Sequence, residues 1–409
     1  MNVRCFCLFL CCVSLAHGQD WNRFRGPNGS GIGNLPVNVP WSTDDYQWHI
    51  DLPGAGHSSP VLWQKRLYLT AGDEETGTRS LLSVETETGK IAWKANFPAE
   101  KHGKHKLNTF ASSTPAVDDK HIYLAWGSPD DSLAMAVNHT GETVWKTSLG
   151  PYKAGHGYGV SPIVQGELVI LTHEHEGESS ILALDRSTGE IRWRVPRKSK
   201  ATYSTPCVGG GESKGILCSN WTHGITALDP STGRNLWELD VFNKEHIETA
   251  IGSPVTAGGL VFAACGWLGV RQELIAVRPP GNQQEKPEVV YRIERNAPLT
   301  TTPLVSGDLL FLWSDQGIVT CAQAATGEIH WRERVGGTYY GSPVATDGKL
   351  FCLNADGDVV VLAASTEFRE LARISLGQAS NSTPAIGPQA IYFRTVNRLY
   401  ALGEKRPAK

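Results

Sequence analysis

The chain has 409 residues, of which 40% are hydrophobic and 19% charged, and it carries a net charge of -3. This length fits two or three ordinary domains or one large β domain. The near-neutral charge gives no electrostatic basis for binding nucleic acid, so we expect no nucleic-acid partner. The 43 Gly and 23 Pro favour a fold with many turns, and 13 Trp beside only 2 Met suggest a periodic pattern.

The N-terminus has the features of a signal peptide. Arg4 precedes an apolar run from Cys5 to Leu15, and small residues follow at Ala16 and Gly18. The run is too short for a permanent membrane span, and no later segment is apolar enough to cross a membrane. We therefore expect residues 1–18 to be removed near Gly18 and the mature protein to be periplasmic or secreted.

Residues 19–43 form a turn-rich N-terminal segment. It includes "WNRFRGPNGSGIG" (Trp21–Gly33), whose glycines are spaced as in a nucleotide-binding loop. A phosphate-binding loop needs a preceding strand and a following helix, and neither is predicted here. We expect this segment to lie across the main domain, which covers residues 44–404 and leaves 405–409 as a tail.

One motif recurs along the main domain. The copies are "SVETETGKIAW" (83–93), "AVNHTGETVW" (136–145), "ALDRSTGEIRW" (183–193), "ALDPSTGRNLW" (227–237) and "CAQAATGEIHW" (321–331). Each has a short apolar strand, a Thr-Gly turn and a second strand that bears Trp. Gly permits positive φ at the turn, and Asp and Thr side chains can bond its backbone. The repetition indicates a structural element and argues against a unique active site.

A second marker is a Ser or Thr followed by a Pro that opens an apolar strand. The prolines are Pro60, Pro115, Pro162, Pro206, Pro254, Pro303, Pro343 and Pro384. Their spacing is roughly 46 residues, with four short strands in each interval, which is typical of a β-propeller blade. The sequence therefore predicts an all-β fold, an eight-bladed β-propeller of four-stranded antiparallel blades.

The two ends of the main domain are predicted to share one blade. After Pro384 the chain supplies only three strands, while residues 46–52 form a lone strand before the first marker. We expect residues 46–52 to complete the last blade as its outer strand. This closure leaves no open edge in the ring.

Five cysteines remain beyond the signal peptide, at Cys207, Cys218, Cys265, Cys321 and Cys352. Cys207 and Cys218 flank the turn "VGGGESKG", where a disulfide is conceivable, but buried free thiols are the favoured interpretation. None of the five has the spacing of a zinc site.

The repeat A-x-D-x-x-T-G-x-x-x-W resembles the tryptophan-docking motif of the pyrroloquinoline quinone (PQQ) β-propeller superfamily. The resemblance spans residues 44–402 and implies that the Trp of one blade packs against the neighbouring blade. The docking residues would be Trp48, Trp93, Trp145, Trp193, Trp237 and Trp331.

The superfamily contains PQQ- and calcium-dependent alcohol or sugar dehydrogenases and also non-catalytic propellers of the outer-membrane barrel-assembly machinery. The dehydrogenases often carry adjacent cysteines beside the quinone. Here the only adjacent pair, Cys11-Cys12, lies in the predicted signal peptide, and no set of calcium ligands stands out. The resemblance therefore favours the non-catalytic members, with no cofactor.

Propellers usually bind ligands at the channel mouth. The loops predicted there present His57, Asn108, His156, Tyr158, Tyr203, Glu248, Thr300, Tyr339, Tyr340, Asn381, Trp126, His173, Trp221, Trp267, Trp313 and Asn354. The candidate ligand-binding residues among them are Trp126, His156, Tyr158, Tyr203, Trp221, Glu248, Trp267, Trp313 and Tyr339.

Four Trp in equivalent loops form the central hypothesis about the mouth. We expect an aromatic collar built by Trp126, Trp221, Trp267 and Trp313 together with the candidate tyrosines Tyr158 and Tyr203. In the alternative hypothesis the four Trp plug the channel or pack beneath loops.

Three polar candidates carry weaker signals. His173 and His175 in "THEHEGE" have a spacing that suits a metal, but a third ligand is missing, so a solvated loop is favoured. Glu248 has no identifiable partner for general-base work, so an ion-pair or capping role is favoured. No catalytic residue and no metal ligand is predicted.

The sequence thus predicts an exported propeller that binds or scaffolds at the cell envelope, with a protein or glycan partner at its mouth. A PQQ-dependent dehydrogenase and a carbohydrate-binding or carbohydrate-processing accessory protein are the alternatives.

Overall fold

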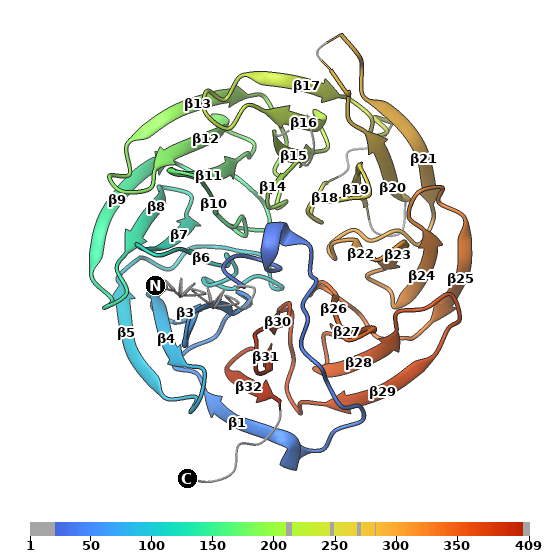
Figure 1. Ribbon diagram of the computed structural model, residues 1–409. Helices are drawn as coiled ribbons and strands as arrows, with labels where there is room; N and C mark the ends of the chain where they lie inside the picture. Colours follow the sequence, from blue (N-terminus) through green and yellow to red (C-terminus); the bar gives the residue numbers. More distant parts are fainter. Residues whose placement is uncertain (1–20, 210–214, 246–248, 268–270, 283, 404–409) are drawn as a thin grey trace, which may run out of the picture.

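The computed structural model of the protein describes residues 21–209, 215–245, 249–267, 271–282 and 284–403. Eight four-stranded antiparallel sheets stand in a ring around a central channel (Figure 1). The described helical elements are two short 3-10 turns, η1 (Pro27–Gly29) and η2 (Thr43–Asp45). No described helix has the length and apolar character needed to cross a membrane. The predicted eight-bladed β-propeller is confirmed.

Blades 1 to 4 follow one another in chain order, each from its innermost to its outermost strand. Blade 1 is β2 (Val61–Trp63), β3 (Arg66–Gly72), β4 (Arg79–Glu85) and β5 (Ile91–Phe97). Blade 2 is β6 (Ala116–Val117), β7 (Ile122–Gly127), β8 (Ser132–Val137) and β9 (Thr143–Gly150). Blade 3 is β10 (Ile163–Gln165), β11 (Leu168–His173), β12 (Ser179–Asp185) and β13 (Ile191–Arg197). Blade 4 is β14 (Cys207–Val208), β15 (Ile216–Asn220), β16 (Gly224–Leu228) and β17 (Asn235–Leu239).

Blades 5 to 7 repeat this order, and blade 8 takes its outer strand from the N-terminal side. Blade 5 is β18 (Val255–Ala257), β19 (Leu260–Trp267), β20 (Arg271–Arg278) and β21 (Glu288–Glu294). Blade 6 is β22 (Leu304–Ser306), β23 (Leu309–Trp313), β24 (Ile318–Gln323) and β25 (Ile329–Arg334). Blade 7 is β26 (Val344–Thr346), β27 (Lys349–Leu353), β28 (Asp358–Ala363) and β29 (Glu370–Ser375). Blade 8 is β30 (Ala385–Ile386), β31 (Ile391–Arg394), β32 (Arg398–Leu402) and β1 (Tyr46–Asp51).

The ring closes where β1 pairs with β32. The register runs antiparallel from Tyr46 opposite Leu402 to Asp51 opposite Arg398, with one irregularity between Tyr46 and Trp48. This is the predicted closure, and the strand ends at Asp51, one residue earlier than expected. It ties the first described strand to the last one, so blade 8 is held by both ends of the propeller.

The burial pattern follows the position of each strand in its blade. The first six residues of β12 are all buried, because this strand packs between two neighbouring blades on both faces. In β13 burial alternates along the strand, because its outward side meets solvent. The apolar runs and alternating runs in the sequence therefore mark middle and outer strands.

The Thr-Gly turns connect the third and fourth strands. In blade 3 the Asp185 carboxylate accepts hydrogen bonds from the amides of Ser187 and Thr188 at 2.8 and 3.0 Å. Gly189 has φ of 74°, and a Cβ there would lie 2.5 Å from the ring of Trp145 in blade 2. The glycine therefore serves twice, because it permits the turn and makes room for the indole of the preceding blade.

Indole N–H groups join neighbouring blades at the same place. They donate to a carbonyl in the turn of the following blade at 2.9–3.0 Å, in the pairs Trp48–Thr86, Trp93–His139, Trp145–Arg186, Trp193–Pro230 and Trp331–Ser365. Tyr291 replaces Trp in blade 5 and donates its hydroxyl to the Ala324 carbonyl at 2.6 Å. Trp237 is buried as well, at 7% exposure.

The alternative Cys207–Cys218 disulfide is not formed, and all five described cysteines are buried and outside any disulfide. Cys207 lies opposite Leu217 in the β14–β15 register, so Cys207 and Cys218 are one position out of step. Neighbouring positions on a strand point to opposite faces of the sheet.

We expect the indole contacts to fasten the blades together. Trp193→Ala removes a side chain that is 8% exposed and its hydrogen bond to blade 4, which should cost about 3 kcal/mol of unfolding free energy. Urea denaturation monitored by far-UV circular dichroism measures the change. Trp267→Ala is the matched control, because Trp267 is 45% exposed. Equal shifts of the two midpoints would contradict a fastening role.

Candidate functional site

One end of the central channel is crossed by residues Trp21–Gly33, which we call the crossing segment. Figure 1 shows this chain at the centre of the ring before it runs outward to β1. The carbonyl of Trp21 accepts a hydrogen bond from the amide of Leu62 in blade 1, and the carbonyl of Asn22 accepts one from Val117 in blade 2. The crossing segment is thus bonded to the innermost strands, which closes this end of the channel.

A buried arginine anchors the crossing segment on the opposite side of the ring. The guanidinium of Arg25, which is 0% exposed, donates to the carbonyl oxygens of Gly29, Pro303 and Pro343 at 3.0–3.1 Å. The ring of Phe24 lines the cavity in the channel. The crossing segment therefore supplies part of the wall of that cavity.

The channel cavity has a volume of about 420 Å³ and brings together loops from around the ring. Its aromatic, imidazole and apolar wall consists of Phe24, His57, His105, Leu107, His156, Tyr203, Ile251, Trp267, Leu299 and Tyr340. Asn108, Thr300 and Asn381 add polar groups. None of the described residues that line it is Asp, Glu, Lys or Arg, so ligand contacts here are apolar or come from neutral polar groups.

A belt of Ser and Thr hydroxyls surrounds the channel at the level of this cavity. Its members are the residues that precede the eight marker prolines, namely Ser59, Thr114, Ser161, Thr205, Ser253, Thr302, Ser342 and Thr383. At seven of the eight junctions the backbone amide of one member donates to the hydroxyl oxygen of the member in the following blade, at 2.9–3.3 Å. The Ser/Thr-Pro spacing in the sequence predicted where these strands begin. That the Ser and Thr side chains form a belt of hydrogen bonds is seen only in the ring of blades.

The hydroxyl belt predicts a specific loss of stability. Thr302→Val keeps the shape of the side chain but removes the acceptor of the buried Ser253 amide, which should cost about 1–3 kcal/mol. Thermal unfolding followed by calorimetry measures the effect. Thr302→Ser retains the hydroxyl and should stay close to the parent protein. Equal loss in the Val and Ser variants would show that packing, and not the hydrogen bond, is responsible.

The electrostatics of the cavity wall are set by cations behind it. Burial, with the positive charges of Arg394 and Lys104, lowers the pKa of His57 to about 4, so His57 is neutral at pH 7. Arg394 is 1% exposed and donates to the Ser58 carbonyl at 2.8 Å. No acidic side chain among the described residues pairs with Arg394, so its charge favours electron-rich groups near this wall.

Three of the candidate ligand-binding residues line the channel cavity. They are His156, Tyr203 and Trp267. The rings of His156 and Tyr203 meet edge to face at 6.1 Å, and His105 lies 4.7 Å from His156. Burial and the neighbouring His105 lower the pKa of His156. Trp267 is 45% exposed, and with the 40% exposed Leu107 it gives the cavity an accessible apolar rim.

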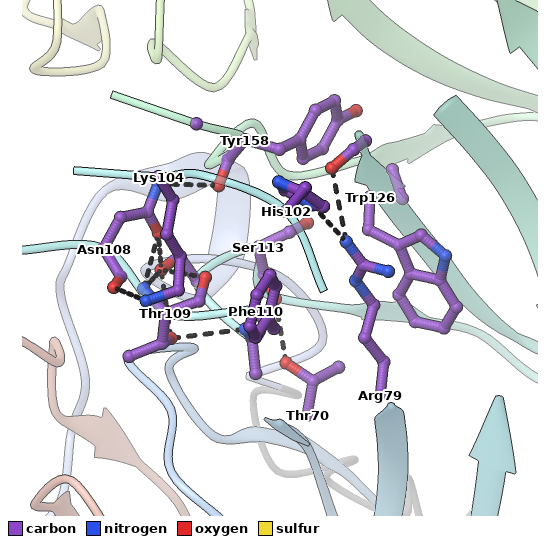
Figure 2. A pocket seen from close by; sticks show the side chains of 15 residues that line it. Thr70, Arg79, His102, Lys104, Asn108, Thr109, Phe110, Ser113, Trp126 and Tyr158 are labelled. Carbon is purple, nitrogen blue, oxygen red and sulfur yellow. Dashed lines mark hydrogen bonds between the residues drawn. The ribbon is translucent and has the colours of Figure 1, made fainter. Parts of the chain in front are cut away.

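Trp126 and Tyr158 do not line the channel cavity but an adjoining small cavity of about 20 Å³ between blades 1 and 2. Figure 2 shows Arg79 of β4 between the rings of Phe110 and Trp126, at 5.6 and 5.7 Å from their centres. Its guanidinium donates to His102 at 3.1 Å. Trp126 is therefore a packing partner of a buried cation.

The remaining aromatic candidates pack against the protein itself. Trp313 and Tyr339 are both 0% exposed, with ring centres 5.3 Å apart. Trp221 donates its indole N–H to the Asn243 carbonyl at 2.8 Å and is covered by Lys244. The four Trp therefore do not form one collar. Trp126 and Trp313 are buried in strands β7 and β23, whereas Trp267, at the end of β19, lines the channel cavity. Glu248 lies outside the described residues.

The expected solvated loop at "THEHEGE" is also corrected. His173, Glu174 and His175 are 0–1% exposed. The two imidazole rings lie 4.7 Å apart, and the Glu174 carboxylate accepts from Arg197 at 3.1 Å. Burial, followed by the neighbouring His175 and Arg194, lowers the pKa of His173 to about 3. The polar residues of this stretch therefore form a buried cluster at the end of β11.

The low pKa of His173 predicts acid sensitivity. In the unfolded chain the His173 imidazole is protonated below about pH 6.5, whereas in the folded chain it is protonated only near pH 3. The free energy of unfolding therefore falls as the pH decreases from about 6.5 to about 3. His173→Gln should flatten the fall between pH 6.5 and 5 by up to about 1.4 kcal/mol per pH unit. Urea titrations at each pH measure it. His330→Gln, at an exposed position, is the control, and an unchanged slope in His173→Gln would refute the assignment.

The described residues do not fit a calcium-bound quinone. Among them no group of three or more His, Cys, Asp or Glu side chains is placed to hold a metal ion. Calcium takes six to eight oxygen ligands, commonly including carboxylates, and none of the described residues lining the channel cavity is acidic.

Comparison with known proteins gives a consistent picture. The profile of the family described as outer membrane protein assembly factor BamB matches residues 42–205, 80–283 and 289–403. Among solved structures, BamB from Moraxella catarrhalis has a TM-score of 0.65 at 17% identity, over 87% of this chain and 98% of that one. A quinohemoprotein alcohol dehydrogenase from Pseudomonas putida has a TM-score of 0.53 at 13% identity, over 96% of this chain and 81% of that one. At these levels of sequence identity, each of the two structures shows only that it has the same fold as this chain. No curated protein sequence matches the chain.

Proposed function

We propose, from the premise that this chain belongs to the family of the outer membrane protein assembly factor BamB, that it is a binding or scaffolding module of the cell envelope. Its partner would be a protein that docks over the open mouth of the channel. The predicted export signal, which lies outside the described residues, agrees with an envelope location.

The exposed apolar rim of the channel cavity is the observation that carries this proposal. Trp267 and Leu107 are two of five large hydrophobic side chains that stand out as exposed among the described residues, and both line the same cavity. They come from blade 5 and from the loop that leads into blade 2. Large apolar side chains that stay exposed around a cavity are typical of interfaces, and Trp is enriched among the residues that dominate binding.

The chemistry of the cavity fits an apolar or aromatic side chain of the partner. Tyr203, Tyr340 and the imidazoles of His57 and His156 provide flat, weakly polar surfaces around it. The cavity of about 420 Å³ holds one large side chain with room to spare. A sugar ring would meet the same aromatic surfaces, so a glycan is the alternative occupant.

The proposal predicts a loss of partner capture on trimming the rim. Trp267→Ala should weaken binding about tenfold or more, because a central Trp anchor contributes about 2 kcal/mol or more. The measurement is in-cell photocrosslinking from position 107, with the captured protein identified and then titrated in purified form. Ile329→Ala is the matched control, since Ile329 is 43% exposed on outer strand β25.

Three outcomes would contradict the proposal. One is equal capture by the Trp267 and Ile329 variants. Another is capture of a glycan in place of a protein, which would favour the carbohydrate-binding alternative. The third is stoichiometric uptake of PQQ with calcium, accompanied by dye-linked oxidation of alcohols or sugars, which would favour a dehydrogenase.

A further inference from the structure

The crossing segment contacts seven of the eight innermost strands and passes over one. The amides of Leu62, Val117, Val208 and Ala345 donate to it from blades 1, 2, 4 and 7. In blade 5 Asn28 donates to Thr256. In blades 6 and 8 the segment packs closely on the innermost strands, since a Cβ on Gly31 would lie 2.8 Å from Leu304 and one on Gly33 would lie 2.4 Å from Ile386. Among the described residues, no hydrogen bond joins the crossing segment to β10 of blade 3.

A cavity of about 250 Å³ lies where this contact is missing. It is lined by Asn22, Arg23 and Asn28 of the crossing segment and by Ala116, Val117, Val164, Gln165 and Val208 of blades 2, 3 and 4. We call it the Arg23 cavity. It shares no lining residue with the channel cavity. Phe24 faces the channel cavity while its neighbour Arg23 faces this one.

Arg23 is a buried cation without a counter-ion in the described chain. It is 7% exposed, its guanidinium donates to the Pro206 carbonyl, and its buried Nε has no hydrogen-bond partner. None of the described acidic side chains forms an ion pair with it, and none lines the cavity. Burial lowers its pKa only to about 10, so Arg23 remains charged at pH 7.

Arg25, two residues along, has more acceptors than Arg23, although its buried Nε likewise has no hydrogen-bond partner. Its guanidinium donates to three carbonyl oxygens in a position with 0% exposure. Arg23 has one such bond and borders a cavity. A buried charge with unused donors is costly unless a partner of opposite charge completes it.

We propose that the Arg23 cavity binds a small oxyanion, either a free phosphate-type ion or the carboxylate of a small organic acid. The planar guanidinium presents paired N–H donors that match two oxygens of such a group. The carboxamides of Asn22 and Gln165 can donate to its remaining oxygens. The site lies outside the proposed partner-binding mouth and stands or falls independently of that function.

The amide of Val164 completes the donor set. Val164 is the second residue after its marker proline, as are Leu62, Val117, Val208 and Ala345, whose amides donate to the crossing segment. In blade 3 the cavity takes the place of that acceptor. A bound oxyanion would accept a hydrogen bond from the Val164 amide. In blades 1, 2, 4 and 7 the equivalent amides donate to oxygen atoms of the crossing segment.

The proposal is tested by isothermal titration calorimetry on the full mature chain. The titrants are sodium phosphate and, in a separate experiment, sodium acetate, and sodium chloride keeps the ionic strength constant. We expect one oxyanion per chain and a loss of affinity of about tenfold or more in Arg23→Met, with a smaller loss in Gln165→Leu. Phosphate binding alone would identify a free-ion site, and acetate binding a carboxylate site. Arg278→Gln, which removes an exposed cation of blade 5, should bind like the parent chain.

Two results would overturn the proposal. One is no saturable binding of either anion by the parent chain up to about 50 mM. The other is equal affinity in the parent chain, Arg23→Met and Gln165→Leu, which would mean that the anions bind elsewhere. If Arg23→Met fails to fold, Gln165→Leu decides, because it leaves the Arg23 anchor to Pro206 in place.

Discussion

The hydrogen bond from the amide of one strand-opening residue to the hydroxyl of its counterpart in the following blade sets the geometry of this protein. It recurs around the channel and fixes how closely the innermost strands approach one another. A neutral hydroxyl can accept this bond at the centre of a ring without adding charge. The width of the channel, and with it the size of the cavity, follows from that repeated contact.

The ring is tightened from its outer side by a different interaction. Four indoles lie over a turn glycine of the following blade and donate to a turn carbonyl, namely Trp48, Trp93, Trp145 and Trp193. The hydroxyl belt joins neighbouring blades near the channel, and the indoles join neighbouring blades at the outer strands. A blade is hydrophobic on both faces, so it is covered only when both neighbours are present.

The crossing segment closes one end of the central channel and leaves the other end open. It places Arg23 and Arg25 against the prolines that precede innermost strands, while Arg394 lies behind the wall beside His57. The interior therefore combines neutral lining groups with buried positive charge. Such an interior favours electron-rich or anionic groups over cations, which bears on both the mouth and the Arg23 cavity.

The residues of the candidate site were only partly predictable from the sequence. His156, Tyr203 and Trp267 were named and do line the channel cavity, whereas Trp313 and Tyr339 are buried and Trp126 packs on Arg79. His156, Tyr203 and Tyr339 come from segments that lead into innermost strands, and the three Trp come from second strands. Within each set the positions are equivalent, so periodicity cannot tell them apart. Whether a loop side chain turns inward or outward depends on its neighbours from other blades.

The sequence by itself determined the number of blades, the turn chemistry and the closing strand, because these depend on local patterns repeated along the chain. Only the tertiary structure decided which cations lack partners, that the Ser and Thr residues form a belt, and where the crossing segment misses a strand. Those features arise between residues as far apart as Arg25 and Pro343, whose hydrogen bond joins positions that nothing in the local sequence relates.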